Sequence, residues 1–238
     1  MKVLILAGGL GTRLAEETSD KPKPMVEING KPILWHIMKT YSSQIDCQFI
    51  ITTGYKAEII DDYLESQEFL AEGISAQALY TGEETSTGGR VRKALLFAPN
   101  ERVMVTYGDG VGDINIQELI NFHDNHGKLA TVTAVRPAAR FGRLEIENDY
   151  VVNFSEKPQA EEGWINGGYF VFEPNVLQYL PADTPPLEHE PLANLAKESE
   201  LMAFRHFGFW QPMDTLREKM DLEKLAVSGQ APWMRRFS

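Results

Sequence analysis

The sequence predicts an α/β fold built on a doubly wound, mostly parallel sheet, with a strand-rich C-terminal part. Three observations support this class. Short apolar runs recur without polar alternation, as is typical of strands that are buried on both faces. Segments with apolar residues at three- and four-residue spacing alternate with these runs. A glycine-rich turn follows the first run, at the position where Rossmann-like sheets bind ligands, beyond the carboxyl ends of their strands.

The first part of the chain, residues 1–136, alternates expected strands with expected helices. Apolar and β-branched runs predict strands at residues 2–7, 48–53, 102–107 and 129–135. Apolar periodicity predicts helices at residues 32–43, 57–69, 88–97 and 116–126. This order of strand, helix and strand favours a parallel sheet over an antiparallel one.

The second part, residues 137–238, has shorter strands joined by turns. Strands are expected at residues 143–147, 150–155 and 164–172, and helices at residues 174–180, 190–199 and 214–227. No long Gly/Ser or charged linker separates the two parts. The sequence therefore predicts a single domain over residues 1–238.

The net charge restricts the partners. The chain has 34 Asp and Glu residues and 23 Lys and Arg residues, which gives a formal charge of −11. This negative charge repels nucleic acid and anionic membranes. The first apolar run is too short for a membrane span or a signal peptide. A single cysteine, Cys47, excludes an internal disulfide and a cysteine-rich zinc site. We expect a cytoplasmic protein that binds neither nucleic acid nor membrane.

Positive charge is nevertheless concentrated near the N-terminus, which favours a small anionic ligand. The cluster consists of Arg13, Lys21, Lys23 and Lys31. Pro22 and Pro24 restrict the backbone on either side of Lys23, which argues against a mobile surface charge at that position. Lys21 and Lys31 are expected to be ordinary solvated lysines.

The turn LAGGLGTR, at residues 6–13, is a candidate phosphate-binding loop. Glycines let backbone amides approach phosphate oxygens and adopt a positive φ. The turn lacks the GK[ST] of a Walker loop, and its glycines do not fit the dinucleotide fingerprint. A tight packing turn is the alternative interpretation, but such a turn does not require Thr12, Arg13 or Lys23.

Asp109 is a candidate metal ligand. It follows the expected strand at residues 102–107 and lies between Gly108 and Gly110, so its carboxylate is expected at the carboxyl end of a strand. Mg²⁺ prefers such oxygen ligands and takes its remaining ligands from water or phosphate. The alternative is a type I′ turn built on Asp-Gly.

Further motifs occur from the N-terminus to about Trp233. They are AGGLGTRL with KPKPM, LWHIMK (34–39), TGGR (87–90), TYGDGV (106–111), RFG (140–142), EKP (156–158), INGGYFV (165–171), EPL (190–192) and GFWQPMDT (208–215). Together they resemble the signature of the sugar-1-phosphate nucleotidyltransferases, also called nucleoside-diphosphate-sugar pyrophosphorylases. TYGDGV and FWQPMDT are the most specific. Members of this family have a longer segment before TGGR than residues 65–87 of this chain.

The resemblance implies the fold, the reaction and the partners. The fold is the nucleotide-diphospho-sugar transferase type, with nucleotide bound by residues 1–136 and sugar phosphate by residues 137–238. The reaction is a Mg²⁺-dependent, in-line attack of α-D-glucose 1-phosphate on the α-phosphate of CTP, which gives CDP-glucose and pyrophosphate. The attacking phosphate is largely ionised at neutral pH, since its second pKa is about 6. No general base is therefore expected. The resemblance also implies that the protein is a homo-oligomer.

The resemblance also implies the roles of individual residues. The catalytic residues are Arg13, Lys23 and Lys157. The nucleotide-binding residues are Leu6, Ala7, Gly8, Gly9, Gly11, Thr12, Arg13, Lys23, Thr87, Gly88, Gly89, Arg90 and Asp109. The sugar-phosphate-binding residues are Gly108, Lys157, Asn166, Gly167, Glu190 and Trp210. The metal ligands are Asp109 and Asp214.

Several of these roles have structural alternatives. Asp214 is equally suited to cap the helix that follows it, and only the resemblance pairs it with Asp109. Tyr169 and Trp210 either line the sugar pocket or belong to the core. Two alternatives for the whole protein also remain: an enzyme that uses UTP or dTTP on a related sugar phosphate, and a non-catalytic nucleotide-sensing module.

Overall fold

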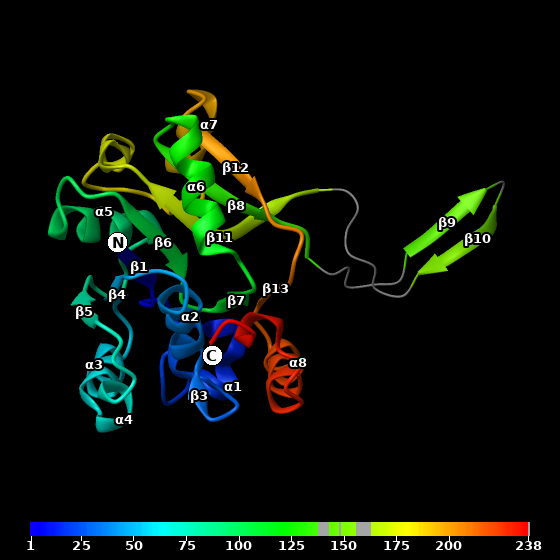
Figure 1. Cartoon of the computed structure of the whole chain (residues 1–238), viewed down its shortest axis with the longest axis horizontal. Helices are drawn as coiled ribbons and strands as arrows, with labels where there is room; N and C mark the ends of the chain where they lie inside the picture. The colour runs from blue at the N-terminus through cyan, green and yellow to red at the C-terminus, as the bar shows by residue number, and fades with distance from the viewer. Residues whose placement is uncertain (138–142, 148, 156–162, 238) are drawn as a thin grey trace.

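The structure is a computed structural model of the chain and describes residues 1–137, 143–147, 149–155 and 163–237. Its centre is a seven-stranded sheet with the strand order β12-β8-β11-β6-β1-β4-β5 (Figure 1). The strands are β1 (Lys2–Leu6), β4 (Gln48–Thr53), β5 (Ala76–Tyr80), β6 (Val103–Tyr107), β8 (Ala130–Val135), β11 (Ile165–Phe172) and β12 (Leu201–Arg205). Only β11 runs antiparallel to its neighbours. The prediction of a mostly parallel α/β sheet is confirmed.

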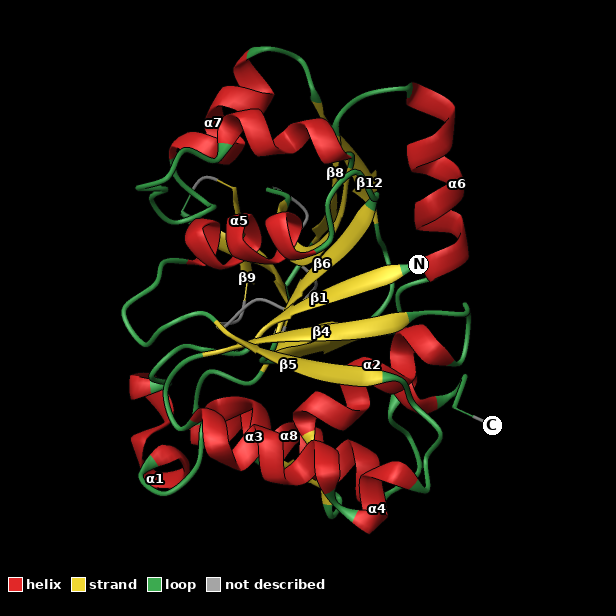
Figure 2. Cartoon of the chain, turned by 90° about the vertical axis from the view of Figure 1, so that its left-hand side faces the viewer, coloured by secondary structure: helices red, strands yellow, loops and turns green. Residues whose placement is uncertain are grey.

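Helices cover both faces of the sheet (Figure 2). The longer ones are α2 (Ile33–Ser42), α3 (Ala57–Glu65), α5 (Thr87–Phe97), α6 (Ile116–His126), α7 (Glu190–Lys197) and α8 (Leu216–Val227). Along β1, Val3 and Ile5 pack into the core that contains α2 and α3 residues, and Leu4 and Leu6 into the core that contains α5 residues. Burial on both faces is why the first apolar run shows no polar alternation.

Strands from both parts of the chain share the central sheet. β11 pairs with β6 of the first part on one side and with β8 on the other, so the expected boundary at residue 136 does not separate two sheets. The hairpin of β9 (Arg143–Glu147) and β10 (Tyr150–Ser155) forms a two-stranded sheet of its own. Within the described residues, no helix is long and apolar enough to cross a bilayer.

A short two-stranded sheet joins distant parts of the sequence. β7 (Gly110–Gly112) pairs antiparallel with β13 (Trp210–Pro212), and the Met213 N–H donates to the Asp109 carbonyl at 2.8 Å. The remaining short elements are β2 (Glu27–Ile28), β3 (Lys31–Pro32), α1 (Ala15–Thr18), α4 (Gln67–Leu70) and the 3₁₀ turns η1 (Thr12–Leu14), η2 (Lys23–Met25), η3 (Pro174–Tyr179) and η4 (Pro232–Met234).

Several elements differ from the sequence prediction. The helix expected at 57–69 is interrupted at Ser66, whose extended backbone (ψ 147°) and side chain cap the N-terminus of α4. The helix expected at 174–180 is the 3₁₀ turn η3, and the one expected at 190–199 ends at Lys197. The two edge strands of the sheet, β5 and β12, are not expected from the sequence. Their side chains are only partly buried, so their apolar signal is weak.

A histidine pair, the buried His123 and the partly exposed His126, lies where α6 ends beside β8. The Lys128 N–H donates to His126 Nδ1, so the proton of this ring is on Nε2, which donates to Thr131 Oγ1 at 2.7 Å. The Thr131 hydroxyl then donates to His123 Nδ1 at 2.8 Å. His123 Nε2 in turn donates to Glu173 Oε1 at 3.2 Å. This chain of donors holds both rings neutral in defined tautomers.

The neutral His123 makes the fold sensitive to acid. Burial is the main cause that lowers the pKa of His123, against the opposing effect of Glu173. The unfolded chain takes up the proton near pH 6.5, so this stability is present above that pH and is lost as the pH falls below it. In His123→Gln the amide replaces both hydrogen bonds without titrating. Between pH 7 and pH 5 the unchanged protein is expected to lose free energy of unfolding. Urea unfolding is expected to show that this loss is smaller in the variant, by up to about 2 kcal/mol. Equal losses in both proteins would contradict this assignment.

Candidate active site

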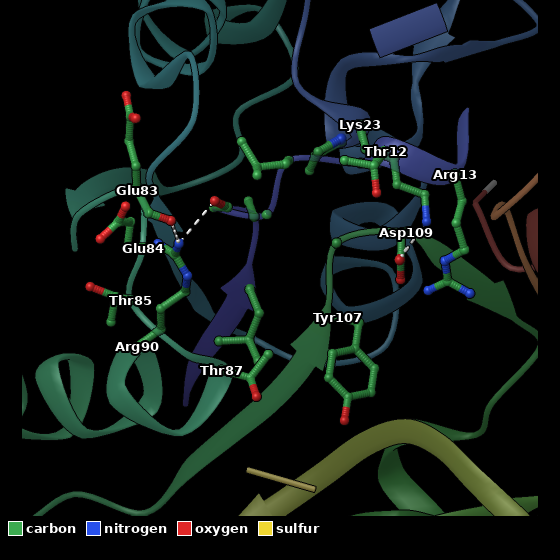
Figure 3. A pocket seen from close by; sticks show the side chains of 18 residues that line it. Thr12, Arg13, Lys23, Glu83, Glu84, Thr85, Thr87, Arg90, Tyr107 and Asp109 are labelled. Atoms are coloured by element: carbon green, nitrogen blue, oxygen red, sulfur yellow. Dashed lines mark hydrogen bonds and ion pairs between the residues drawn. The ribbon is translucent and has the colours of Figure 1, made fainter. Parts of the chain in front are cut away.

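A cavity of about 430 Å³ opens beyond the carboxyl ends of β1 and β6. Its walls come from the turn after β1, the segment before α5 and the end of β6 (Figure 3). Most of the predicted nucleotide-binding residues line it: Leu6, Ala7, Gly8, Gly9, Gly11, Thr12, Arg13, Lys23, Thr87, Arg90 and Asp109. Leu10, Pro24, Glu83, Glu84, Thr85, Tyr107 and Gly108 complete the lining. The cavity therefore lies where α/β sheets of this kind bind ligands.

Glycine is required at different positions of the turn for different physical reasons. Gly11 has a φ of +65° and begins the 3₁₀ turn η1, so it needs a left-handed conformation. A Cβ on Gly8 would lie 2.0 Å from Arg90 Nη1, so a side chain there would displace the guanidinium. A Cβ on Gly9 would have no atom within 4 Å. Packing therefore explains Gly8 and backbone geometry explains Gly11, while the space beside Gly9 is open to a ligand.

Lys23 joins the two predicted metal ligands. Its ammonium Nζ lies 2.7 Å from Asp109 Oδ2 and 2.5 Å from Asp214 Oδ1. The Lys23 side chain is only 9% exposed. On the outer side, Arg13 Nη1 lies 2.7 Å from Asp214 Oδ2, and the Arg13 side chain is 73% exposed. Two cations and two carboxylates thus form one cluster at the rim of the cavity.

The alternatives for the two aspartates are wrong. Asp109 and its flanking glycines do not have the positive φ that a type I′ turn requires. The N-cap of α8 is Thr215, which forms a capping box with Glu218. The carboxylate of Asp214 is therefore not used to cap this helix and is directed to Lys23 and Arg13.

The donor set suits a divalent cation that arrives with substrate. Asp109 and Asp214 are close enough to contact a common ammonium, so they present carboxylate oxygens to a common point. In the described part of the chain, no group of three or more His, Cys, Asp or Glu side chains is arranged to hold a metal. Mg²⁺ is typically bound by one or two carboxylates and completes its shell with water and substrate phosphates. The two aspartates fit that pattern.

Arg90 holds the base of the glycine turn. It is 3% exposed, and its Nη2 donates to the carbonyls of Gly8 and Glu83 at 2.9 and 3.0 Å. Its Nη1 donates to the Thr53 carbonyl and the Thr81 hydroxyl at 2.8 and 2.5 Å. Burial lowers the pKa of Arg90. These partners are all uncharged, so the guanidinium brings a positive charge to the cavity wall while it ties three segments together.

The glycines of the TGGR motif lie behind the cavity lining. A Cβ on Gly88 would lie 2.3 Å from the Pro185 carbonyl oxygen, and one on Gly89 would lie 2.9 Å from Thr85 Cγ2. Neither glycine lines the cavity. Close packing of α5 against the segment at residues 184–187 accounts for Gly88.

Among the predicted sugar-side residues that the structure describes, Gly108 lines the cavity, whereas Asn166, Gly167, Glu190 and Trp210 do not. Asn166 Nδ2 donates to the Tyr107 hydroxyl at 3.0 Å, and Trp210 Nε1 donates to the Gly167 carbonyl at 2.7 Å. Tyr169 is buried in the core, stacked on Tyr41, so the core interpretation of this residue is the right one. Lys157 lies outside the described residues.

Sequence reasoning missed a carboxylate next to the cavity. Glu188 accepts hydrogen bonds from the Tyr107 hydroxyl and, at 2.7 Å, from Thr87 Oγ1, and both donors line the cavity. The predicted Glu190 is exposed and does not line it. The two glutamates are two residues apart, and no local pattern in LEHEPL distinguishes which of them faces Tyr107.

The cavity lining contains neither histidine nor cysteine among the residues that the structure describes. Burial raises the pKa of the Cys47 thiol to about 11, so this group is not a thiolate at neutral pH. The site therefore offers cations, hydroxyls and backbone N–H groups around a pair of carboxylates. This set suits phosphate binding and charge neutralisation rather than a nucleophilic side chain.

Curated proteins and solved structures resemble the chain over nearly its whole length. Glucose-1-phosphate cytidylyltransferase of Salmonella typhi is 47% identical over 98% of both chains. A probable glucose-1-phosphate cytidylyltransferase of Bacillus subtilis is 40% identical over 98% of this chain and 99% of its own. HddC of Yersinia pseudotuberculosis in complex with GMP-PN has a TM-score of 0.73 and 26% identity over 94% and 98% of the two chains.

More distant relatives and a family model also match most of the chain. The catalytic subunit beta of mannose-1-phosphate guanylyltransferase from Drosophila melanogaster is 34% identical, over 90% of this chain and 61% of its own. The family described as nucleotidyl transferase matches residues 2–204. The glycine turn, Lys23 and Asp109 all lie within that match. With this match and these relatives, the resemblance to sugar-1-phosphate nucleotidyltransferases is confirmed, and the chain belongs to the nucleotidyl transferase family.

Proposed function

We propose that the protein transfers a cytidylyl group from CTP to α-D-glucose 1-phosphate, with Mg²⁺ as cofactor, and so makes CDP-glucose and pyrophosphate. The observation that carries this proposal is the meeting of Asp109 and Asp214 on Lys23, at the rim of a glycine-lined cavity. The names of the relatives with 40% and 47% identity support the choice of CTP and glucose 1-phosphate.

The charge distribution supports a reaction between two anions. The protein carries a formal charge of −11, yet Arg13, Lys23 and Arg90 all line one cavity. Figure 3 shows Thr12, Arg13, Lys23 and Asp109 gathered on one side of this cavity, with Glu83, Glu84 and Arg90 on the other. We place the triphosphate on the first side, because Glu83 and Glu84 would repel it on the second.

The proposed step moves no proton. One oxygen of the sugar phosphate forms a bond to the α-phosphorus of CTP, and the bond from that phosphorus to the pyrophosphate oxygen breaks. The bonding electron pair leaves on pyrophosphate. A bound Mg²⁺, held by Asp109 and Asp214, would neutralise charge on the phosphate oxygens. The absence of histidine from the described cavity lining is consistent with this step, because the attacking phosphate is already ionised.

The protein's own side chains position the reactants. Lys23 and Arg13 neutralise phosphate oxygens of the nucleotide, and backbone N–H groups of the turn at residues 8–12 donate to them. Lys157 would neutralise the sugar phosphate. Asn166 and Trp210 are proposed to support the sugar pocket through Tyr107 and Gly167. We also propose a cytoplasmic location, since nucleoside triphosphates are intracellular metabolites.

The substrate assignment predicts a clear preference in a matrix of nucleotides and sugar phosphates. CTP with glucose 1-phosphate is expected to release pyrophosphate at least about a hundredfold faster than UTP, dTTP or GTP, because a site that hydrogen-bonds one base leaves its groups unpaired with another. A coupled pyrophosphate assay and identification of the product by mass spectrometry make the measurement. Preference for UTP or dTTP would refute the base assignment, and CTP binding without turnover would favour the nucleotide-sensing module.

The metal assignment predicts that Asp109→Asn and Asp214→Asn each lower kcat by at least about a hundredfold, as removal of one charge-stabilising group typically does. Asp221→Asn is the matched control, because Asp221 is an exposed residue of α8 near Asp214 in sequence. It is expected to keep the activity of the unchanged protein. Thermal unfolding of the three variants separates loss of chemistry from loss of fold. Full turnover of either site variant in Mg²⁺ would refute this metal site.

We propose that the protein is a homo-oligomer, as the family resemblance implies. The hairpin supports this, since Tyr150, Val151 and Val152 are 76%, 55% and 53% exposed. Light scattering is expected to give a multiple of the 26.8 kDa chain mass. The double variant Tyr150→Ser with Val152→Ser is expected to lower that mass. A mass of one chain at all protein concentrations would disprove self-association.

A further inference from the structure

We propose that Lys23 and the divalent cation compete for the same two carboxylates, so that the metal binds firmly only when a nucleotide phosphate takes over the Lys23 ammonium. Lys23 is then an exchangeable counter-ion of the metal ligands as well as a phosphate-binding group. This inference rests on the proposed function, because it takes Asp109 and Asp214 as the metal ligands.

The geometry requires the competition. Lys23 Nζ contacts Asp109 Oδ2 at 2.7 Å and Asp214 Oδ1 at 2.5 Å. Both oxygens of Asp214 are engaged by cations, Oδ1 by Lys23 and Oδ2 by Arg13, so a metal held jointly by the two carboxylates would have to share or displace one of these contacts. The ammonium and a metal ion both carry positive charge, so they repel each other across the few ångströms of this cluster. The side chain of Lys23 is 9% exposed, and water therefore screens this repulsion less than it does at the surface.

The local charge balance gives the same result. Lys23 and Arg13 together carry two positive charges, and Asp109 and Asp214 carry two negative ones. A divalent cation added alone leaves an excess of two positive charges in a partly buried cluster. A nucleoside triphosphate carries about four negative charges, by the ionisation of phosphoryl groups near neutral pH. Its arrival reverses that excess and provides new acceptors for Lys23.

Lys23 has a path to those acceptors. The residue lines the same cavity as the glycine turn, and a Cβ added to Gly11 would lie 3.1 Å from Lys23 Cβ. Figure 3 shows Lys23 beside Thr12, with Asp109 bonded to its ammonium. A lysine ammonium is a compact charge on a flexible four-carbon stem, so it can move from carboxylate to phosphate by side-chain rotation. Arg13 is different, because it contacts Asp214 alone from the outer side.

The competition predicts coupling between the two ligands. A nucleotide that draws Lys23 away raises the affinity for metal, and by linkage the metal raises the affinity for nucleotide by the same factor. Metal alone is expected to bind weakly to the unchanged protein. Removing the ammonium is then expected to strengthen metal binding while it weakens catalysis. A purely structural role for Lys23 predicts no gain in metal affinity.

The test is a titration of the whole protein with Mn²⁺ in the absence of nucleotide. Binding is measured from the electron paramagnetic resonance signal of the Mn²⁺ that stays free. Lys23→Met keeps a long side chain and removes the charge. We expect it to bind Mn²⁺ at least about tenfold more tightly than the unchanged protein, since close charge pairs couple this strongly. Adding Asp109→Asn to this variant is expected to abolish the gain, which assigns the ion to this site.

Lys21→Met is the matched control. It removes the same charge two residues away, where the ammonium pairs with Glu27 at 3.7 Å. Its Mn²⁺ affinity is expected to stay within about twofold of the unchanged protein, as for exposed charges. If Lys23→Met binds Mn²⁺ no more tightly than Lys21→Met, the competition is refuted.

A second measurement does not depend on the folding of any variant. A crystal structure of the unchanged protein with Mg²⁺ and a non-hydrolysable CTP analogue is expected to show Lys23 Nζ on a phosphate oxygen. An ammonium that still bridges both carboxylates beside the metal overturns the proposal. The proposed function fails separately: a gain in Mn²⁺ affinity in Lys23→Met, together with no CDP-glucose synthesis by the unchanged protein, supports the competition and refutes cytidylyl transfer. CDP-glucose synthesis without that gain refutes the competition alone.

Discussion

The candidate site depends on one ammonium that two carboxylates from distant parts of the chain share. Lys23 follows the glycine turn, Asp109 lies between β6 and β7, and Asp214 precedes α8. The ladder between β7 and β13 brings Asp214 within reach, with the Met213 N–H bonded to the Asp109 carbonyl. Without this short two-stranded sheet the carboxylates would have no common partner. The cluster therefore depends on a tertiary contact between two segments that are about a hundred residues apart in the sequence, β7 and β13.

A second constraint fixes one wall of the cavity. Arg90 is buried, and its hydrogen bonds to the glycine turn, to the end of β4 and to the segment after β5 involve only uncharged oxygens. A buried charge without a carboxylate partner is costly unless its donors are satisfied, and here four hydrogen bonds satisfy them. The same arrangement explains Gly8, since any side chain at that position would collide with the guanidinium. One buried residue thus ties together three segments of the cavity wall.

The protein is negatively charged overall, but several of its cations are gathered at the cavity. A formal charge of −11 disfavours large polyanions, while the cations at the cavity are held in place by carboxylates that a metal also prefers. In the proposed competition, the demands on Asp109 and Asp214 would link the metal to the nucleotide through Lys23. The relatives with 40% and 47% identity bear the names of enzymes that join a nucleotide to a sugar phosphate, and such a reaction brings together two anions that repel each other.

Local patterns in the sequence were sufficient for the central strands, for most helices and for the position of Asp109 at a strand end. These features depend on side chains a few residues apart, such as the unbroken burial of β1 on both faces. Tertiary structure alone decided the meeting of Asp109 with Asp214, the choice of Glu188 over Glu190 beside Tyr107, and the pairing of the edge strands β5 and β12. Each of these depends on contacts between segments far apart in the chain, and such contacts leave no periodic trace in the local sequence.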